Sequence, residues 1–315
     1  MARTILLRPE ETYLVDSPIL QRLRYVRQLG VGHYLFPSSG YSRFEHSLGA
    51  LHSATNIFDR LFDRNAAKPM GVPEAKVEAH RRIVRAAALL HDIGHCVFSH
   101  VSERFYAQNP EVKAAQVSIS KALQNRVSAS ETLSILIICS DPFVGLLQAS
   151  RLCPSDYSPA EFAGRIAECI AGASNKLLPH AYLAEIVNGV IDCDKLDYLA
   201  RDAQSAGVPI SLDVERLYSK LRLTEATTKK GNKAFVLAIE QSGVRALEEM
   251  LASRIFLYDK FYYHQKVMAA EELARRALSR LAEAIPDLAS PWLCFRWVMT
   301  ICCSPHQENL LRGLR

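Results

Sequence analysis

Residues 88–100 read ALLHDIGHCVFSH, so that three histidines and one aspartate interrupt an otherwise apolar segment. The apolar residues before His91 continue a helical pattern that begins near residue 74, and Gly94 breaks it. An unpaired polar group is costly to bury, so polar side chains in such a segment need partners. The stretch therefore predicts a helix whose C-terminal end carries polar residues into the core.

The HD pair suggests what those partners are. His91 and Asp92 are adjacent, so both side chains can lean toward one ion. Imidazole and carboxylate together bind divalent metals, and a single-ion site would need about two further ligands. Candidates are His46, in RFEHS, and Asp194, in DCDKLDYLARD, both in segments that are unusually polar for buried helices. The order H…HD…D on separate helices therefore predicts one metal site.

Helical patterns dominate the rest of the chain. SPILQRLRYVRQLG (17–30) begins with a capping serine and a proline suited to the first helical position, and it ends in glycine. Further helices are predicted at 43–62, 74–93, 129–138, 159–171, 181–190, 192–205 and, with an interruption near LYDKFYYHQK, 241–283. TTKKGNKAFVLAIE (227–240) differs, because a basic glycine turn precedes a short β-like run. We expect an all-α (mostly α) fold with a small β-hairpin near 227–240.

The composition limits the class of protein. With 49% hydrophobic and 23% charged residues, the 315-residue chain can bury a sizeable core, and its net charge of +5 is too small to imply nucleic-acid binding. The eight cysteines form no CxxC pair, which favours reduced thiols. The N-terminus lacks a signal-peptide h-region, and the most apolar run, LSILIIC (133–139), is too short to cross a bilayer. We expect a cytoplasmic protein without a membrane partner.

The motifs in their order resemble the HD-domain superfamily of metal-dependent phosphohydrolases, and within it the deoxynucleoside triphosphate (dNTP) triphosphohydrolase branch. The resemblance covers roughly residues 8–270 and is carried by DSPILQRLRYVRQLGVGHYLFPSSGYSRFEHSLG, ALLHDIGHCVFSHVSE and IVNGVIDCDKLDYLARDAQSAGV. It implies a helical HD domain over residues 1–285, with 286–315 as a C-terminal extension of that domain. It also implies hydrolysis of dNTP to deoxynucleoside and tripolyphosphate, in nucleotide-pool control or phage defence.

Carried over by position, the resemblance implies a set of site residues. One divalent ion (Mn, Fe, Mg, Zn or Ni) would be held by His46, His91, Asp92 and Asp194. The triphosphate would be held by Arg43, His100, Lys195 and Tyr198, whose cationic and hydroxyl donors suit phosphate oxygens. Asp202 would bind the ribose 3′-hydroxyl with Gln28 nearby, and Arg254 would be a further phosphate contact. Arg254 equally fits a solvated helix residue, Gln28 a capping residue, and Tyr258, Tyr262 and Tyr263 either core aromatics or a base-stacking wall.

The catalytic candidates are His95, His100 and Glu103. His95 is the first choice to move a proton, and Glu103 either orients it or acts itself. One position departs from the family pattern: Ser130 stands where the relatives carry histidine, while the glutamate after it, Glu131, is retained. Either His95 and Glu103 suffice, or the activity is weaker or altered.

Other functions remain open. Asp16, Gln21 and Arg24 match positions that bind an activating guanine nucleotide at a subunit interface in vertebrate members of the branch, yet the same residues suit ordinary helix capping. Homo-oligomers are expected by analogy. The alternatives are another HD phosphohydrolase, acting on nucleoside monophosphates, cyclic or alarmone nucleotides or nucleic-acid ends, and a catalytically weak nucleotide sensor. Nucleic-acid binding has only RLRYVR (22–27) in its favour.

Overall fold

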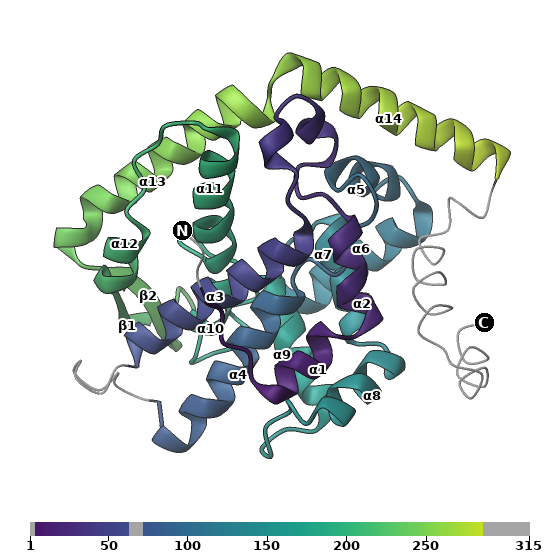
Figure 1. Cartoon of the computed structure of the whole chain (residues 1–315). Helices are drawn as coiled ribbons and strands as arrows, with labels where there is room; N and C mark the ends of the chain where they lie inside the picture. Colours follow the sequence, from purple (N-terminus) through teal and green to yellow (C-terminus); the bar gives the residue numbers. More distant parts are fainter. Residues whose placement is uncertain (1–3, 63–71, 286–315) are drawn as a thin grey trace.

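The computed structural model describes residues 4–62 and 72–285, and it is predominantly helical (Figure 1). The α-helices are α1 (Pro9–Val15), α2 (Pro18–Gln21), α3 (Arg43–Leu61), α4 (Glu74–Leu90), α5 (His100–Tyr106), α6 (Pro110–Leu123), α7 (Ala129–Ile138), α8 (Asp141–Ser150), α9 (Pro159–Ile170), α10 (Tyr182–Val187), α11 (Cys193–Ala206), α12 (Val214–Lys220), α13 (Val244–Leu257) and α14 (Gln265–Ala284). Shorter helical turns are η1 (Arg22–Tyr25), η2 (Gly30–Tyr34), η3 (Pro37–Ser39), η4 (Gln241–Gly243) and the π-helical η5 (Tyr258–Tyr262), and the strands are β1 (Leu221–Thr227) and β2 (Lys233–Ile239).

Helix α3 lies at the centre of the molecule and packs against α4 and α11 (Figure 1). It begins at a capping box, in which Ser42 Oγ accepts a hydrogen bond from the Glu45 amide and the Glu45 carboxylate accepts one from the Ser42 amide. Small buried residues such as Ala50 and Ala54 allow its neighbours to approach closely. This packing brings the first turn of α3, the end of α4 and the start of α11 together.

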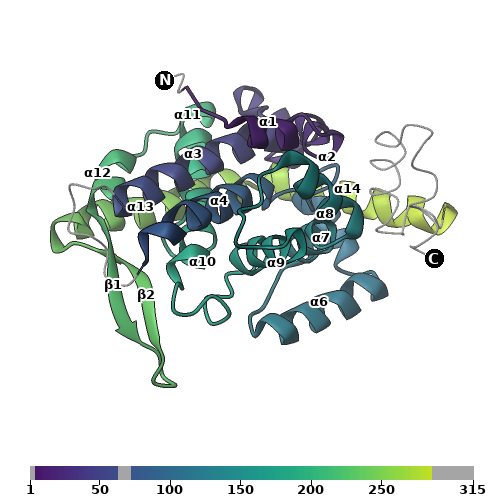
Figure 2. The same ribbon diagram turned by 90° about the horizontal axis from the view of Figure 1, so that it is seen from below.

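The predicted fold class is confirmed, including the β-hairpin. Strand β1 pairs antiparallel with β2, with Leu221 opposite Ile239 and Thr227 opposite Lys233. The hairpin therefore begins earlier than the expected range of 227–240. Gly231, with φ of +82°, takes up the left-handed conformation in the turn. Figure 2 shows the hairpin extending away from the helical body.

The prediction of one helix over 17–30 is wrong. After α2 and η1 the chain becomes extended, because its backbone pairs with the segment before α3: the Gln28 amide donates to Tyr41 O at 3.1 Å and the Arg43 amide to Val26 O at 2.8 Å. Leu20, Leu23 and Val26 are all buried, and their spacing of three suits a 3₁₀ helix as well as an α-helix. The consequence is that Gln28 is brought close to the start of α3.

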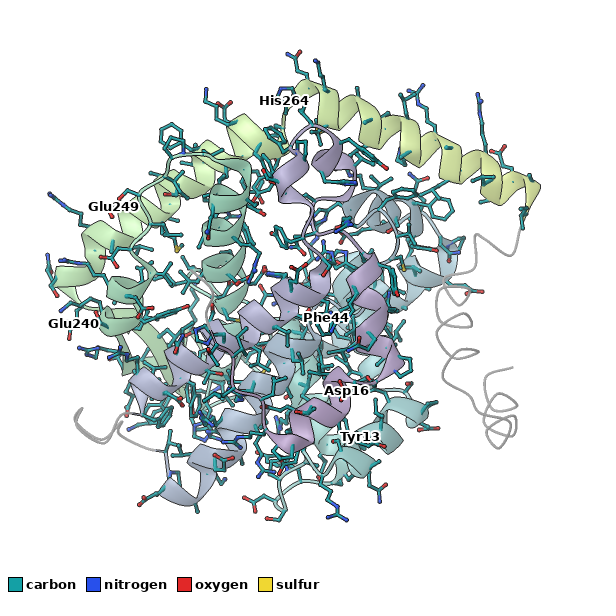
Figure 3. The ribbon with its side chains drawn as sticks, viewed as in Figure 1. Tyr13, Asp16, Phe44, Glu240, Glu249 and His264 are labelled. Carbon is teal, nitrogen blue, oxygen red and sulfur yellow. The ribbon has the colours of Figure 1, made fainter. Side chains whose placement is uncertain are left out.

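The interrupted helix predicted over 241–283 is observed as α13, η5 and α14. His264, labelled in Figure 3, caps α14 at the corner where the chain changes direction. From there α14 runs over α5, and in this way the C-terminal part of the described chain covers one side of the site.

Within the described ranges, no single helix is long and apolar enough to span a membrane; α7 and α8 reach that length and apolarity only together, as a pair bent by 63°. Most of α7 is buried in the protein core. Four of the described cysteines, Cys139, Cys153, Cys169 and Cys193, are free thiols. Three of the remaining cysteines and the expected C-terminal extension (286–315) lie outside the described residues.

Candidate active site

All four residues predicted to bind the metal come together in the structure. His46 comes from the first turn of α3, His91 caps the C-terminal end of α4, and Asp92 follows it; ligand atoms of these three lie within 4.8 Å of one another. Asp194, in the first turn of α11, places Oδ1 2.9 Å from His46 Nε2 and 3.8 Å from His91 Nε2. Two imidazoles and two carboxylates thus face one small volume.

The imidazoles of this cluster are held in defined orientations. His46 Nδ1 lies 2.9 Å from Asp197 Oδ2, and His91 Nδ1 lies 2.8 Å from Ala88 O. Each of these contacts leaves Nε2 directed to the cluster, which is the arrangement usual for metal-binding histidines. Asp197 was not predicted as a site residue, although its place three residues after Asp194 on one helix was a signal that both side chains share a face.

The electrostatics of the cluster suit a bound cation. Burial alone lowers the pKa of His46, but hydrogen bonds to Asp194 and Asp197 raise it overall to about 10. Burial raises the pKa of the Asp92 carboxyl, yet Arg43 and the surrounding imidazoles bring it well below its ordinary value. A metal ion needs neutral imidazole, so its binding would expel the His46 proton and balance the same carboxylates. The residues present therefore fit a divalent ion with nitrogen and oxygen ligands.

The stretch 88–100 forms a helix end, a turn and a helix start rather than one helix. Helix α4 ends at Leu90, Asp92 and His95 lie in the turn, and His100 opens α5. A Cβ atom on Gly94 would meet Ser130 O at 2.2 Å, so only glycine lets this turn approach α7 so closely. The turn directs Asp92 and His95 into the interior, where both are buried.

Arg43 is almost completely buried and joins the cluster to the segment before α5. Its Nη1 donates to Asp92 Oδ2 at 2.5 Å, and its Nε donates to Ser99 Oγ at 3.1 Å. Ser99 in turn donates to Gln28 O at 3.0 Å. A guanidinium group has five N–H donors, so these contacts leave donors available for a phosphate oxygen. Ser99 is a second site residue that was not predicted from the sequence.

A cavity of about 440 Å³ opens beside the cluster. Every residue predicted to bind substrate lines it: Gln28, Arg43, His100, Lys195, Tyr198, Asp202 and Arg254. The cluster contributes Asp92 and Asp194, and the turn contributes His95. The remaining wall is largely apolar or aromatic, with Leu29, Phe36, Tyr258, Phe261, Tyr262, Tyr263, Val267 and Met268. Its size and mixed lining are typical of a small-molecule site.

The polar residues of the cavity wall have defined partners. Lys195 donates to Gly189 O at 2.9 Å and to the Asp192 carboxylate. Asp202 accepts hydrogen bonds from the hydroxyls of Tyr41 and Tyr262, but burial dominates and raises the pKa of its carboxyl to about 6. The Lys195 ammonium group and the buried Asp202 carboxyl, about two turns later in α11, thus lie on the same wall.

The tyrosines near η5 belong to this wall as well. Tyr258 and Tyr262 pack edge to face with ring centroids 4.9 Å apart, and Arg254 lies over the Tyr258 ring at 5.5 Å. Tyr263 lines the cavity, although the side chain is largely exposed. The structure therefore places Arg254 at the cavity rather than on a fully solvated helix face.

The catalytic candidates lie at the edge of the cluster. His95 Nε2 is 3.4 Å from Asp92 Oδ1, and its Nδ1 is buried with no hydrogen-bond partner among the described residues. Glu103 does not line the cavity; its carboxylate contacts His100 Nδ1 at 3.1 Å and accepts from Ser130 Oγ at 2.7 Å. The hydrogen bonds of Glu103 therefore orient His100, and Ser130 supplies a donor to that pair. The rings of His95 and His100 lie 5.5 Å apart.

The residues matching the effector positions lie outside the cavity lining. Asp16, labelled in Figure 3, is exposed at the end of α1. Arg24 Nε donates to Gln21 Oε1 at 2.6 Å, and the Arg24 guanidinium lies 3.8 Å from the centre of the Phe44 ring. Two of the three residues therefore contact each other at the surface.

Comparison with known proteins matches family descriptions to the regions that carry the cluster and the cavity. The HD domain family matches residues 43–202, and the HD associated region matches 212–290. The chain is 30% identical over 274 residues to human deoxynucleoside triphosphate triphosphohydrolase SAMHD1, covering 82% of this chain and 40% of that protein. It is 29% identical over 268 residues to the uncharacterized protein YwfO of Bacillus subtilis, covering 85% and 51%. A crystal structure of a hypothetical protein from Aquifex aeolicus superposes with a TM-score of 0.64 at 28% identity, covering 93% of this chain and 68% of the other. The chain thus spans about half of one of these curated relatives and 40% of the other.

Proposed function

The chain belongs to the HD-domain family of metal-dependent phosphohydrolases, and on that premise we propose that it hydrolyses dNTPs to deoxynucleoside and tripolyphosphate. The observation that carries the proposal is the continuity between the cluster and the cavity. The cluster of two histidines and two aspartates opens directly into a space lined by Arg43, Lys195 and Arg254. A bare metal site would serve many phosphate esters, but three cationic side chains around it suit a polyphosphate.

The other end of the cavity supports a nucleoside. Asp202 is buried between two tyrosine hydroxyls on the same wall as Tyr198, where a carboxyl group can bind a sugar hydroxyl. Aromatic rings from η5, such as Tyr258 and Tyr262, offer faces or edges to a base. We assign Gln28 to the same end because it lies on the cavity wall with its Oε1 buried and without a partner among the described residues.

The proposed reaction is attack of water on the α-phosphorus with cleavage of the bond to the 5′ oxygen. His46, His91, Asp92 and Asp194 would hold a divalent ion, which when bound would polarise a phosphate oxygen and supply part of the charge balance. Arg43 and Lys195 hold the triphosphate and neutralise charge that develops on its oxygens. These two residues are already fixed by their contacts with Asp92 and Asp192, so little reorganisation is needed when substrate binds.

Two histidines divide the proton transfers. Burial, with the nearby Arg43 cation, brings the pKa of His95 well below its ordinary value, so this imidazole is neutral and able to accept the proton of the attacking water. His100 is hydrogen-bonded through Nδ1 to Glu103, which orients the ring and leaves Nε2 to protonate the departing 5′ oxygen. Ser130 stabilises the Glu103 carboxylate by donating to Oε1. Under this proposal the serine substitutes for the expected histidine by holding Glu103 in place.

An activity panel tests the proposal. The purified chain is incubated with Mn²⁺, Mg²⁺ or Fe²⁺ and each of the four dNTPs, alone and mixed, and products are separated by ion exchange. Asp92→Ala is the inactive variant, and Asp156→Ala, in an exposed loop away from the cavity, is the matched control. We expect deoxynucleoside and tripolyphosphate from the chain and the control only. Activity confined to mixtures would favour a nucleotide effector, and consumption of monophosphates or cyclic nucleotides alone would favour a different HD phosphohydrolase.

By lowering the supply of dNTPs, this activity would serve nucleotide-pool control or defence against phage, and we propose such a role. A homo-oligomer is proposed by similarity to relatives. If all nucleotides bind but none is consumed, the alternative of a nucleotide sensor replaces the enzyme.

A further inference from the structure

We propose that Arg22 and Ser134 are positioning residues that fix the turn carrying Asp92 and His95, and so set the geometry of the metal cluster and of the proton acceptor. The inference rests on the proposed function, because it assigns these residues a role in that same site. Neither residue lines the cavity or belongs to the cluster. Both act through the backbone of residues 91–95.

Arg22 holds one side of the turn. Its Nη1 donates to His95 O at 2.7 Å and its Nη2 donates to Ile93 O, so one guanidinium group joins two carbonyls of the turn to η1. Ile93 and His95 are each more than seventy positions away from Arg22 in the chain. Arg is suited to this because its planar fork offers two N–H groups in a fixed relation, whereas Lys offers a single charge on a flexible stem.

Ser134, in α7, holds the other side. Its hydroxyl donates to His91 O at 2.7 Å and accepts from the Gly94 amide at 2.9 Å. Ser134 is completely buried, and Gly94 approaches its backbone so closely that a Cβ would lie 2.5 Å from the Ser134 amide nitrogen. The turn is therefore pressed against α7 and fixed there by a hydroxyl that donates and accepts at once.

The turn depends on such partners because it follows the end of a helix. The last carbonyls of an α-helix and of the turn after it have no partner within the helix, and a buried unpaired carbonyl is costly. Ile93 is fully buried, and Asp92 and His95 are nearly so, which keeps water from filling this role. The C-terminal end of α4 also carries partial negative charge, which favours a guanidinium group beside it.

Loss of either partner should displace the ligands without emptying the site. In the structure Asp92 Oδ1 is 3.4 Å from His95 Nε2 and 3.5 Å from His91 Nε2. His91 is the first residue of the turn, and Asp92 and His95 follow it. A shift of this backbone therefore moves one carboxylate ligand and the proton acceptor together. The phosphate contacts on α11 would stay in place, so binding of substrate should change less than its turnover.

The test uses Arg22→Gln, Arg22→Lys and Ser134→Ala. The matched controls are Arg82→Gln and Ser140→Ala. The Arg82 guanidinium also donates to a backbone carbonyl, that of Leu152, and the hydroxyl of Ser140, which follows α7, donates to Ile137 O. Each protein is titrated with Co²⁺ and its visible absorption spectrum is recorded, and kcat and KM for dNTP are measured separately.

For Arg22→Gln and Ser134→Ala we expect Co²⁺ affinity or kcat to fall roughly 10- to 100-fold, with an altered cobalt spectrum and KM within about threefold of the original chain. Arg22→Lys keeps the charge and should recover only part of the loss; it also serves if Arg22→Gln does not fold. Controls should match the original chain.

The inference is overturned if Arg22→Gln or Arg22→Lys, together with Ser134→Ala, retain the original cobalt spectrum, cobalt affinity and kcat. If the chain binds cobalt but consumes no dNTP, the proposed substrate fails, and the cobalt spectra still decide whether Arg22 and Ser134 position the cluster. If the unaltered chain binds no cobalt, both proposals fail.

Discussion

Gly94→Ala should disable the site through a collision with α7. The added Cβ would lie 2.2 Å from Ser130 O, 2.5 Å from Ser134 N and 2.8 Å from Ser134 Oγ. Ser130 O and Ser134 N are backbone atoms of the buried helix α7, so rotation of a side chain cannot relieve the collision. Ordinary contact begins at 3.4 Å, so the turn and α7 must separate by about 1 Å.

That displacement has two measurable consequences. Overpacking of this kind typically costs about 1–3 kcal/mol, which urea unfolding at equilibrium measures as a change in the free energy of unfolding. The same movement displaces Asp92 and His95, and a misplacement of about 1 Å can reduce turnover roughly 100-fold. We therefore expect a folded, destabilised variant with kcat for dNTP reduced by about two orders of magnitude.

The matched controls are Gly145→Ala in α8 and Gly164→Ala in α9, since a Cβ at either position meets nothing within 4 Å. Alanine in a helix should raise stability by about 0.5–1 kcal/mol and leave kcat unchanged. The reasoning is refuted if Gly94→Ala keeps both the original stability and a kcat within twofold, because the turn would then tolerate the separation from α7.

Three further predictions concern other parts of the structure. Asp197→Asn, which weakens the partner that orients His46, should reduce metal affinity roughly 10- to 100-fold in a folded protein, measured by Mn²⁺ titration; unchanged affinity would exclude an orienting role. Glu11→Ala removes one partner of a buried ion pair with Arg85 and should cost about 3–5 kcal/mol in urea unfolding, whereas a loss below about 1 kcal/mol would contradict the assignment. Burial raises the pKa of Asp202 to about 6, so the folded state binds this proton more tightly than the unfolded state. The stability that this group contributes is therefore present below about pH 4 and is lost as the pH rises through 6. Relative to Asp202→Asn, the original chain should therefore lose roughly 2–3 kcal/mol over that interval, and a flat difference would contradict the raised pKa.

Much of the site could be predicted because its residues fall in three short segments. His46, His91, Asp92 and Asp194 each stand in a distinctive local context, and the helices that carry them were predicted from apolar periodicity. Most of the residues predicted to bind substrate followed from the same segments through resemblance, whereas Arg254 lies outside them. What could not be predicted depends on partners distant in sequence: the role of Asp197 becomes visible only beside a histidine 151 positions away.

The segment 17–30 shows a different limit. Apolar residues three apart fit α-helical and 3₁₀ periodicity alike, so local pattern could not reveal that residues 26–28 leave the helix to pair with 41–43. That pairing places Gln28 on the cavity wall and lets η1 present Arg22 to the turn. Tertiary hydrogen bonds, rather than propensity, decided this part of the chain.

The most direct test of the proposed reaction is hydrolysis of a dNTP in water enriched in ¹⁸O, with both products analysed by mass spectrometry. Attack on the α-phosphorus predicts deoxynucleoside without label and intact tripolyphosphate carrying one ¹⁸O atom. Label in the 5′-hydroxyl of the deoxynucleoside, or formation of deoxynucleoside monophosphate and pyrophosphate, would contradict the account.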